Sequence, residues 1–315
     1  MAIVRKKVTF AALFVAHATM AMTTARADDG PPPTPRHRLS WDNLIGARLN
    51  PLGLEDQFSI AYRARLYSHG SKILRSNHVG VTFSPSLSPA NTRLGGALEL
   101  KPASVFTLRA SFYFIDYFGS FGSVQSFASH YDNTSDTALK QGKELGLNYS
   151  TSGYELTLHA SAAVKFGPVA VQSEFAAQCM KLALRNGHPV FYNSSLDMVV
   201  PNGGWSLLSD TNVVYFTKVG LVAGIRGSML HALYRAADRL PSEPPGNLNS
   251  PMWRAGPLVA YTFFDRPGAR FNKPTIFAHA AWWLAQRYRT GDDVSQAIPY
   301  AVFGFRVEGD LVRVE

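Results

Sequence analysis

The most constraining feature of this chain is an alternation of apolar and polar residues with a period of two, which recurs along most of its length. Period two places successive side chains on opposite faces, as in a β-strand. Residues 105–113, 154–165 and 300–311 alternate in this way, and no extended 3.6-residue periodicity follows the N-terminal segment. The sequence therefore predicts an all-β fold. In residues 57–67 the apolar face carries Phe58, Ile60, Tyr62, Ala64 and Leu66.

Eight further segments complete a set of about twelve expected strands, and the connections between them differ in length. Turns such as 102–103 and 167–168 are tight, whereas 118–153, 185–209 and 236–252 are long and rich in Ser, Asn, Gly and Pro. Short turns on one rim and long loops on the other are typical of an outer-membrane barrel with an even number of strands. The further strands are expected at residues 43–50, 78–86, 93–101, 169–184, 210–217, 219–230, 253–264 and 275–288.

A water-soluble β-sandwich is the competing interpretation, because one buried face also produces period two. Two observations favour the barrel. Many segments reach about ten residues, the length that a tilted membrane strand needs, whereas soluble strands centre near five or six. Aromatic residues also gather at strand ends, as in the interfacial girdles of membrane barrels. Examples are Tyr113, Phe114, Tyr117, Phe118, Tyr261, Phe263, Phe264, Trp282 and Trp283.

On these grounds residues 41–315 resemble Gram-negative outer-membrane β-barrel proteins, at the level of architecture. The resemblance implies a transmembrane, antiparallel, up-and-down barrel of about 12 strands in the cell outer membrane, surrounded by lipid. Such proteins usually end in a strand that closes on an aromatic residue. Here the chain continues through Leu311-Val312-Arg313-Val314 to Glu315, which departs from that pattern.

The N-terminus has the pattern of an export signal. Arg5, Lys6 and Lys7 precede an apolar stretch, and Ala25-Arg26-Ala27 supplies a small-x-small cleavage site. We expect a cleaved signal peptide at residues 1–27 and a proline-rich lead at 28–40, since prolines exclude helix and central strand. The single Cys179 cannot form an intramolecular disulfide, so packing or a closed sheet must hold the exported chain.

If the apolar faces meet lipid, the opposite faces line a lumen in which basic residues outnumber acidic ones. A narrow basic passage favours anions. The same arginines could instead pair with glutamates and fill a small barrel, and both interpretations stay open. The expected lumen residues are Arg48, Arg63, Arg65, Arg109, Lys165, Arg226, Arg287 and Arg306, with Glu155, Glu174, Glu99 and Glu308 among them.

The function expected first is a pore for small solutes, with anions as a candidate class. A barrel without transport, whose long loops bind a surface partner, is the alternative. Removing four basic residues with the signal leaves 27 Lys and Arg against 22 acidic residues, a net charge of +5, and no basic run indicates nucleic acid. The histidines lack metal-ligand spacing, so no metal or other cofactor is expected.

A lipid hydrolase is the third and weakest hypothesis. Tyr67-Ser68-His69-Gly70-Ser71 resembles the Tyr-x-His-x-Ser core of outer-membrane phospholipase A and lipid A deacylase, whose His and Ser face lipid. Continued alternation puts His69 and Ser71 on the lumen side with Arg63 instead, and Lys72-Ile73 replaces the Asn-Gly of the phospholipase motif. We therefore do not expect an enzyme.

The predicted signal can be checked directly. N-terminal sequencing of the protein purified from membranes should begin at Asp28, because cleavage follows Ala27. Sequencing that starts at Met1 or Ala2 would show that the segment is retained.

Overall fold

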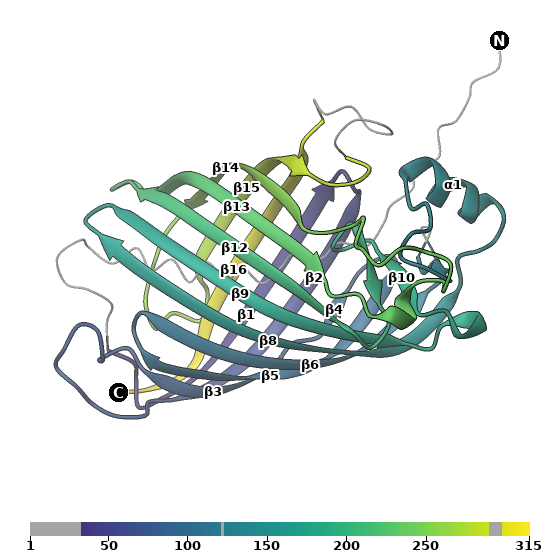
Figure 1. Ribbon diagram of the computed structural model, residues 1–315. Helices are drawn as coiled ribbons and strands as arrows, with labels where there is room; N and C mark the ends of the chain where they lie inside the picture. The colour runs from purple at the N-terminus through teal and green to yellow at the C-terminus, as the bar shows by residue number, and fades with distance from the viewer. Residues whose placement is uncertain (1–32, 121–122, 290–297) are drawn as a thin grey trace, which may run out of the picture.

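The protein is described by a computed structural model that covers residues 33–120, 123–289 and 298–315. The expected signal peptide and the first part of the proline-rich lead lie outside these residues. The described chain forms one closed antiparallel barrel (Figure 1). Its strands are β1 (His37–Leu49), β2 (Gly53–Ala64), β3 (His78–Phe83) with β4 (Ser86–Leu87), β5 (Asn91–Ala103), β6 (Phe106–Phe118), β8 (Ser150–Phe166), β9 (Val169–Leu182), β12 (Trp205–Phe216), β13 (Leu221–Ala232), β14 (Met252–Thr262), β15 (Asn272–Ala285) and β16 (Tyr300–Val314).

The barrel has twelve strand positions, as the sequence predicts, because β3 and β4 are two halves of one strand. Both pair with β2 on one side and with β5 on the other. Each remaining strand pairs with its neighbours along the chain, so the topology is up-and-down. The predicted all-β barrel is confirmed.

The sheet closes where β1 pairs with β16 over the whole length of β1. The register runs from His37 opposite Val314 to Leu49 opposite Ala301, with one irregularity at Leu39/Ser40. The closing strand therefore includes the residues that follow the expected strand end at Leu311. Strand β1 likewise begins at His37, so residues 37–40 of the expected lead belong to the barrel.

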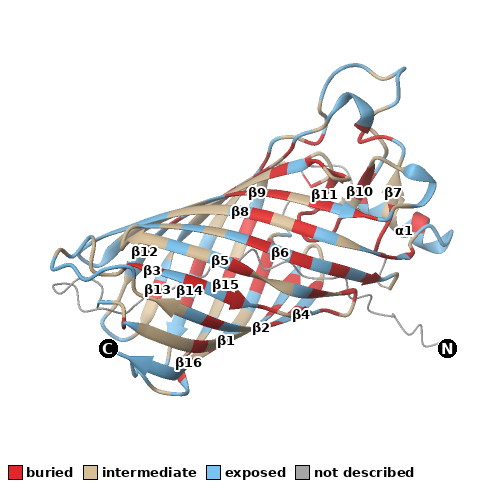
Figure 2. Cartoon of the chain, turned by 90° about the horizontal axis from the view of Figure 1, so that it is seen from below, coloured by how far each residue is buried: buried red, intermediate tan, exposed pale blue. Residues whose placement is uncertain are grey.

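Burial alternates along the strands in the way that a barrel in lipid requires. Successive residues of β3 are buried and exposed in strict turn, and the pattern continues around the wall (Figure 2). The outward residues are large and apolar: Leu98 is 66% exposed and Phe114 is 64% exposed. Inward positions such as Gln57 and Thr157 are polar and buried. This arrangement pairs the strands within the wall and presents mainly apolar side chains outside.

The two rims of the barrel differ in the length of the connections between strands, and the elements outside the barrel wall lie in the long connections. The β5–β6, β8–β9 and β12–β13 turns and the C-terminus share one end, which we call the short-turn rim (Figure 1). The other end, the long-loop rim, carries the β6–β8, β9–β12 and β13–β14 connections. These connections contain helix α1 (Asp136–Glu144) and a small sheet of β7 (Ser126–Phe127), β10 (Val190–Asn193) and β11 (Met198–Pro201). Of the helices described, none has the length and apolar character to cross a membrane.

If the outward side chains face lipid, the free-energy cost of introducing a charge there should depend on how deep the position lies in the bilayer. Leu98→Lys, near the middle of β5, should lower the free energy of unfolding by about 2–4 kcal/mol, because a charge at the bilayer midplane loses its hydration. Urea unfolding in lipid vesicles measures this difference.

Leu284→Lys is the matched control, since Leu284 is equally exposed at 68% but lies at the end of β15. Its cost should be roughly 0–1 kcal/mol. Equal costs at the two positions would contradict a bilayer around the wall.

Candidate functional site: a lumen closed by a hairpin

A hairpin from the β9–β12 connection occupies the lumen near the long-loop rim. It consists of β10, β11 and the turn at residues 194–197, and we call it the plug hairpin (residues 190–201). Phe191 and Val199 have no exposed surface. One apolar cluster joins the hairpin to inward residues of four different wall strands. A segment that touches strands around the wall of a closed barrel must lie inside it. The wall side chains of this cluster are Tyr113, Ile115, Tyr117, Met180, Leu182, Leu230, Ala232 and Met252.

Arg48 of β1 holds the tip of the plug hairpin. Its side chain points inward and has no exposed surface. Nη1 donates to the Ser195 carbonyl at 2.7 Å and Nη2 donates to the Ser194 carbonyl at 2.6 Å, while Nε donates to the Pro51 carbonyl at 3.0 Å. Hydrogen bonds from a charged donor are stronger than neutral ones, so this arginine fixes the depth of the tip.

A second arginine, Arg289, grips the same tip from the loop after β15. Its Nε and Nη2 each donate to an oxygen of Asp197 at 2.8 Å, and both side chains are almost fully buried. Burial alone would lower the pKa of the Arg289 guanidinium, but the hydrogen bonds and charge of Asp197 raise that pKa above its usual value. Arg289 therefore stays charged. Its Nη1 also pairs with Asp136 at 2.5 Å, so loss of Asp197 would leave Arg289 with one carboxylate, whereas loss of Arg289 would leave the buried Asp197 without an ion-pair partner.

The short-turn half of the lumen is filled in a different way, by polar pairs. Arg63 Nε lies 3.1 Å from Glu99, which also contacts His78 Nε2 at 2.6 Å. His159 Nδ1 lies 2.9 Å from Glu174. These pairs compensate one another across neighbouring strands, which reduces the net positive potential that unpaired arginines would give.

The ten residues expected to form a solute pathway do not form one surface. Arg48 binds the plug hairpin, while Arg63, Arg226, Arg306, Glu155 and Glu174 have polar partners on the wall. Lys165 lies 4.6 Å over the Phe216 ring. Arg109 is the exception, because no hydrogen bond or ion pair of this side chain occurs within the residues that the model covers. Most of the expected lumen residues are therefore paired, and their role in a solute pathway stays a prediction.

Arg65 and Arg287 were expected on strands and instead lie just beyond them. β2 ends at Ala64 because the Asn77 side chain accepts the backbone N–H groups of Leu66 and Tyr67. Arg65 therefore donates to the Thr34 carbonyl at the short-turn rim. β15 ends at Ala285, and Arg287 donates to the Tyr131 carbonyl in the β6–β8 loop.

Several lumen residues were not identified from the sequence. Arg93 of β5 faces Glu155 of β8 at 3.5 Å, and both are buried. Arg93 shares the parity of Glu99 on the same strand, so alternation alone could have found it. Asp197 and Arg289 gave no such signal, because their pairing depends on two loops that are 92 residues apart.

His69 and Ser71 lie in the exposed β2–β3 connection at the short-turn rim. The His69 Nδ1 atom accepts the backbone N–H of Ser71 at 3.0 Å, and the Ser71 hydroxyl accepts the N–H of Ile73. Among the described residues no carboxylate hydrogen-bonds to His69. The two side chains shape a turn, and a nucleophile would need a base and an orienting group there.

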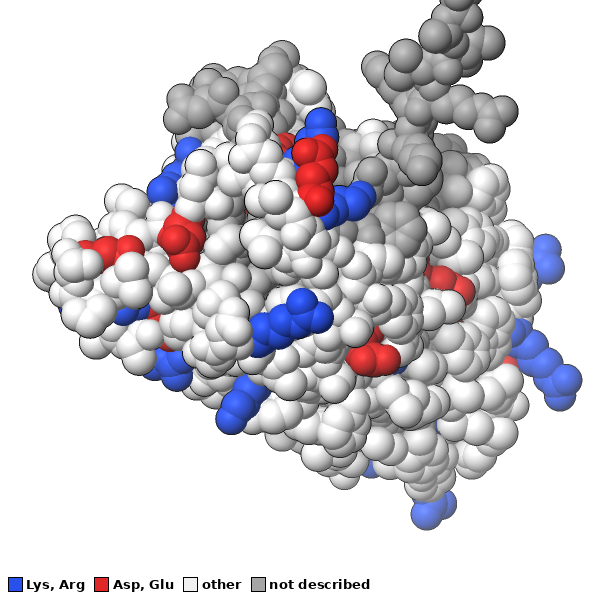
Figure 3. All heavy atoms as spheres, turned by 90° about the vertical axis from the view of Figure 1, so that its right-hand side faces the viewer, with Lys and Arg blue, Asp and Glu red and all other residues white. Residues whose placement is uncertain are grey.

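The long loops bind one another above the plug hairpin and form a cap. His130 of the β6–β8 loop lies 2.9 Å from the Asp238 carbonyl through Nδ1, and Asn249 donates to the His130 carbonyl at 2.6 Å. Ser129 hydrogen-bonds to Glu243. On the visible surface of this end, charges of both signs are scattered among uncharged residues (Figure 3).

No protein-family model matches the sequence, and no curated protein matches it. Similar solved structures include CdiB from Acinetobacter baumannii (8% identity, TM-score 0.39), which matches 87% of this chain and 60% of its own. The translocator domain of autotransporter NalP from Neisseria meningitidis has 12% identity and TM-score 0.38 over 86% of this chain and 87% of its own. An outer membrane channel from Pseudomonas putida F1 has 11% identity and TM-score 0.40 over 90% and 98%. These similarities assign no function, and the closed sheet itself identifies the fold as a twelve-stranded β-barrel of the outer-membrane type.

Proposed function

We propose that this protein is a gated channel of the bacterial outer membrane that admits small anionic solutes, and that the plug hairpin is its gate. One observation carries the proposal: the hairpin is held in the lumen by reversible contacts from Arg48 and Arg289. The outward apolar band supports residence in the outer membrane, reached through the expected signal peptide. In the closed form described here, the hairpin blocks the long-loop end of the passage.

The polar half of the lumen supports the same proposal. A barrel that needed only to be filled could use apolar side chains throughout, since buried ion pairs seldom stabilise more than apolar packing does. Arg109 and the Arg63–Glu99–His78 group instead keep the short-turn half polar. When the hairpin moves, this half can hydrate and conduct.

A second candidate is a barrel without transport that presents its cap to a surface partner. The mutual binding of the β6–β8 and β13–β14 loops, through His130, Asn249 and Asp238, favours this role because it gives the cap a defined shape. We propose no catalytic role for His69 and Ser71, whose contacts serve the turn.

Removal of the plug hairpin separates the two candidates. The backbone N–H of Asn202 donates to the Pro189 carbonyl at 2.7 Å, so a short Gly-Ser linker can replace residues 190–201 without moving the wall. In planar bilayers this variant should conduct steadily, whereas the wild type should be closed most of the time. Water that enters the lumen would solvate Arg48 in the variant.

Heat-modifiable migration on a denaturing gel verifies that this variant folds. A folded variant that shows no conductance at any voltage would reject the channel and leave the partner-binding barrel.

The Asp197–Arg289 pair should control opening. Asp197→Asn removes one of the two carboxylates that pair with Arg289 and leaves Asp136, so its cost should lie below the roughly 3–5 kcal/mol of a buried charge left unpaired. The cost falls on the closed state, so the fraction of time spent conducting should rise severalfold in single-channel recordings.

Arg313→Gln is the control, because Arg313 pairs with Glu315 at the exposed C-terminus. Equal open fractions in Asp197→Asn and wild type would show that the pair does not hold a gate.

A further inference from the structure

A group of buried N–H donors in the lumen has no acceptor among the residues that the structure describes. Arg254 of β14 buries its Nε and Nη1 atoms without any hydrogen-bond partner, and Trp283 does the same with Nε1. Arginine and tryptophan nitrogens can only donate. Because buried polar groups are nearly always hydrogen-bonded, these donors indicate that an acceptor binds there.

Arg254 is held rigidly despite lacking a polar partner. Its guanidinium carbon lies 3.9 Å from the centre of the Tyr300 ring and 5.1 Å from that of Trp283. Two aromatic contacts fix the guanidinium in place while leaving its N–H groups available. A preoriented cation loses little entropy when it binds an anion.

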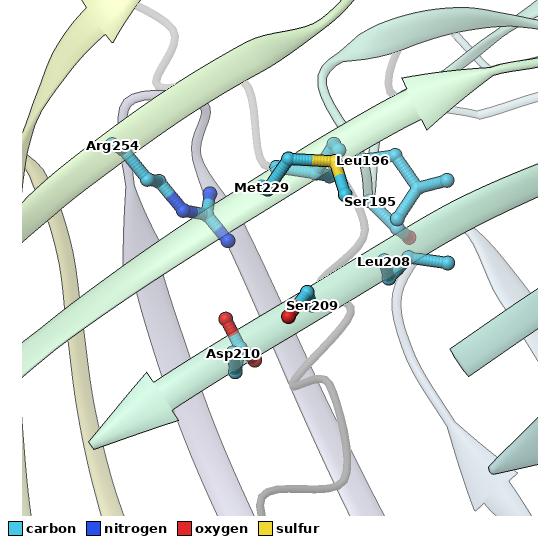
Figure 4. A pocket seen from close by; sticks show the side chains of 8 residues that line it. Ser195, Leu196, Leu208, Ser209, Asp210, Met229 and Arg254 are labelled. Atoms are coloured by element: carbon cyan, nitrogen blue, oxygen red, sulfur yellow. The ribbon is translucent and has the colours of Figure 1, made fainter. Parts of the chain in front are cut away.

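The Arg254 side chain lines a cavity of about 20 Å³ directly beneath the tip of the plug hairpin. Ser195 and Leu196 of the tip form one side of this cavity. Asp210 and Arg254 lie in one row across β12, β13 and β14, and the Arg254 guanidinium is directed toward the Asp210 carboxylate (Figure 4). Asp210 accepts a hydrogen bond from the Ser228 hydroxyl at 2.5 Å. The space suffices for about one water molecule, so a larger ligand fits only if the tip moves.

Arg48 lies beside the same ring. The guanidinium carbon of Arg48 is 6.0 Å from the centre of the Tyr300 ring, and that of Arg254 is 3.9 Å from the same centre. The two guanidinium carbons therefore lie no farther apart than these two distances added together. The hydrogen bonds of Arg48 go to carbonyl oxygens, two of which belong to Ser194 and Ser195 at the hairpin tip. A carboxylate offers the same kind of acceptor with a full negative charge, and therefore binds a guanidinium more strongly than neutral carbonyls do.

We propose that Arg48 and Arg254 form a binding site for the carboxylate of a small organic anion, and that the hairpin tip occupies the Arg48 half of this site in the closed channel. The inference rests on the proposed gating function and deepens it by naming the solute class. Two guanidinium groups outweigh the single acid Asp210. The remaining cavity walls favour an anion with an apolar body over a bare inorganic ion. They are Leu208, Met229 and Leu230 of the barrel strands.

Competition for Arg48 links binding to opening. A carboxylate that binds Arg254 and Arg48 displaces the Ser194 and Ser195 carbonyls, so the solute itself releases the gate. Benzoate is a suitable probe because it joins one carboxylate to one apolar ring. Titration calorimetry of the mature protein in detergent should detect its binding.

Arg254→Gln should weaken benzoate binding by about tenfold or more, the effect of losing one charged hydrogen-bonding partner. This variant should fold, because Nε and Nη1 of Arg254 have no hydrogen-bond partner among the described residues and the change leaves no acceptor unpaired. Arg266→Gln, in the exposed turn after β14, is the matched control and should bind benzoate as the wild type does. Unchanged binding in Arg254→Gln would overturn the site.

Hydrogen exchange tests the competition. Benzoate should speed amide exchange across residues 190–201 in the wild type but not in Arg254→Gln, with sodium chloride of equal ionic strength as the reference. Exchange that is slowed or unchanged would refute displacement of the tip. The variant lacking the hairpin should bind benzoate more tightly, since its competitor is gone.

The outcomes separate this inference from the proposed function. Benzoate binding that depends on Arg254, in a protein that never conducts, would keep the site and reject the channel. A hairpin-free variant that conducts without binding benzoate would keep the channel and reject the site.

Discussion

The pairing of β1 with β16 is the constraint on which the rest of the structure depends. Lipid offers no hydrogen-bond partners, so a sheet can cross the membrane only if its first and last strands pair and leave no edge. The ladder between His37 and Leu49 of β1 and the end of the chain meets this requirement. Closure then divides the side chains into two sets. Outward ones must be apolar, and inward ones must fill a narrow enclosed space.

The lumen is filled by different parts of the chain in the two halves of the barrel, and this difference is relevant to the proposed function. In the short-turn half, pairs such as Arg63 of β2 with Glu99 of β5 join wall strands across β3, and both partners belong to the wall. In the long-loop half, the filling comes from a separate hairpin whose apolar side chains, Phe191 and Met198 among them, pack on the wall. Full burial of one such side chain stabilises by roughly 1.5–3 kcal/mol. Noncovalent filling of this kind can be reversed, whereas wall residues are permanent.

Much of the barrel could be predicted from the sequence, because period two is a local property of each strand. The segment expected at 57–67 corresponds to β2 at Gly53–Ala64, and the one expected at 300–311 to β16. The errors lie at strand ends, where a side chain distant in the sequence can determine the last residue of the strand. At the end of β2, the Asn77 side chain accepts the backbone N–H groups of Leu66 and Tyr67. The position of the plug hairpin inside the barrel could not be predicted from alternation. Residues 185–209 have the composition of a loop, and only tertiary contacts place them inside.

The same limit applies to the lumen arginines. Alternation could predict that Arg48 and Arg306 face inward, but not which acceptor each would meet. Arg306 meets Asp42 on the adjacent strand and is a permanent part of the wall. Arg48 meets carbonyl oxygens of the plug hairpin, which is not part of the barrel wall.

An arginine can therefore fill the lumen in one state and bind solute in another, so the two roles need not exclude each other. What distinguishes them is whether the acceptor belongs to the barrel wall or to the hairpin. By this criterion Arg48 would belong to the proposed gate, and Arg254, whose Nε and Nη1 have no hydrogen-bond partner in the described chain, would belong to the proposed solute site.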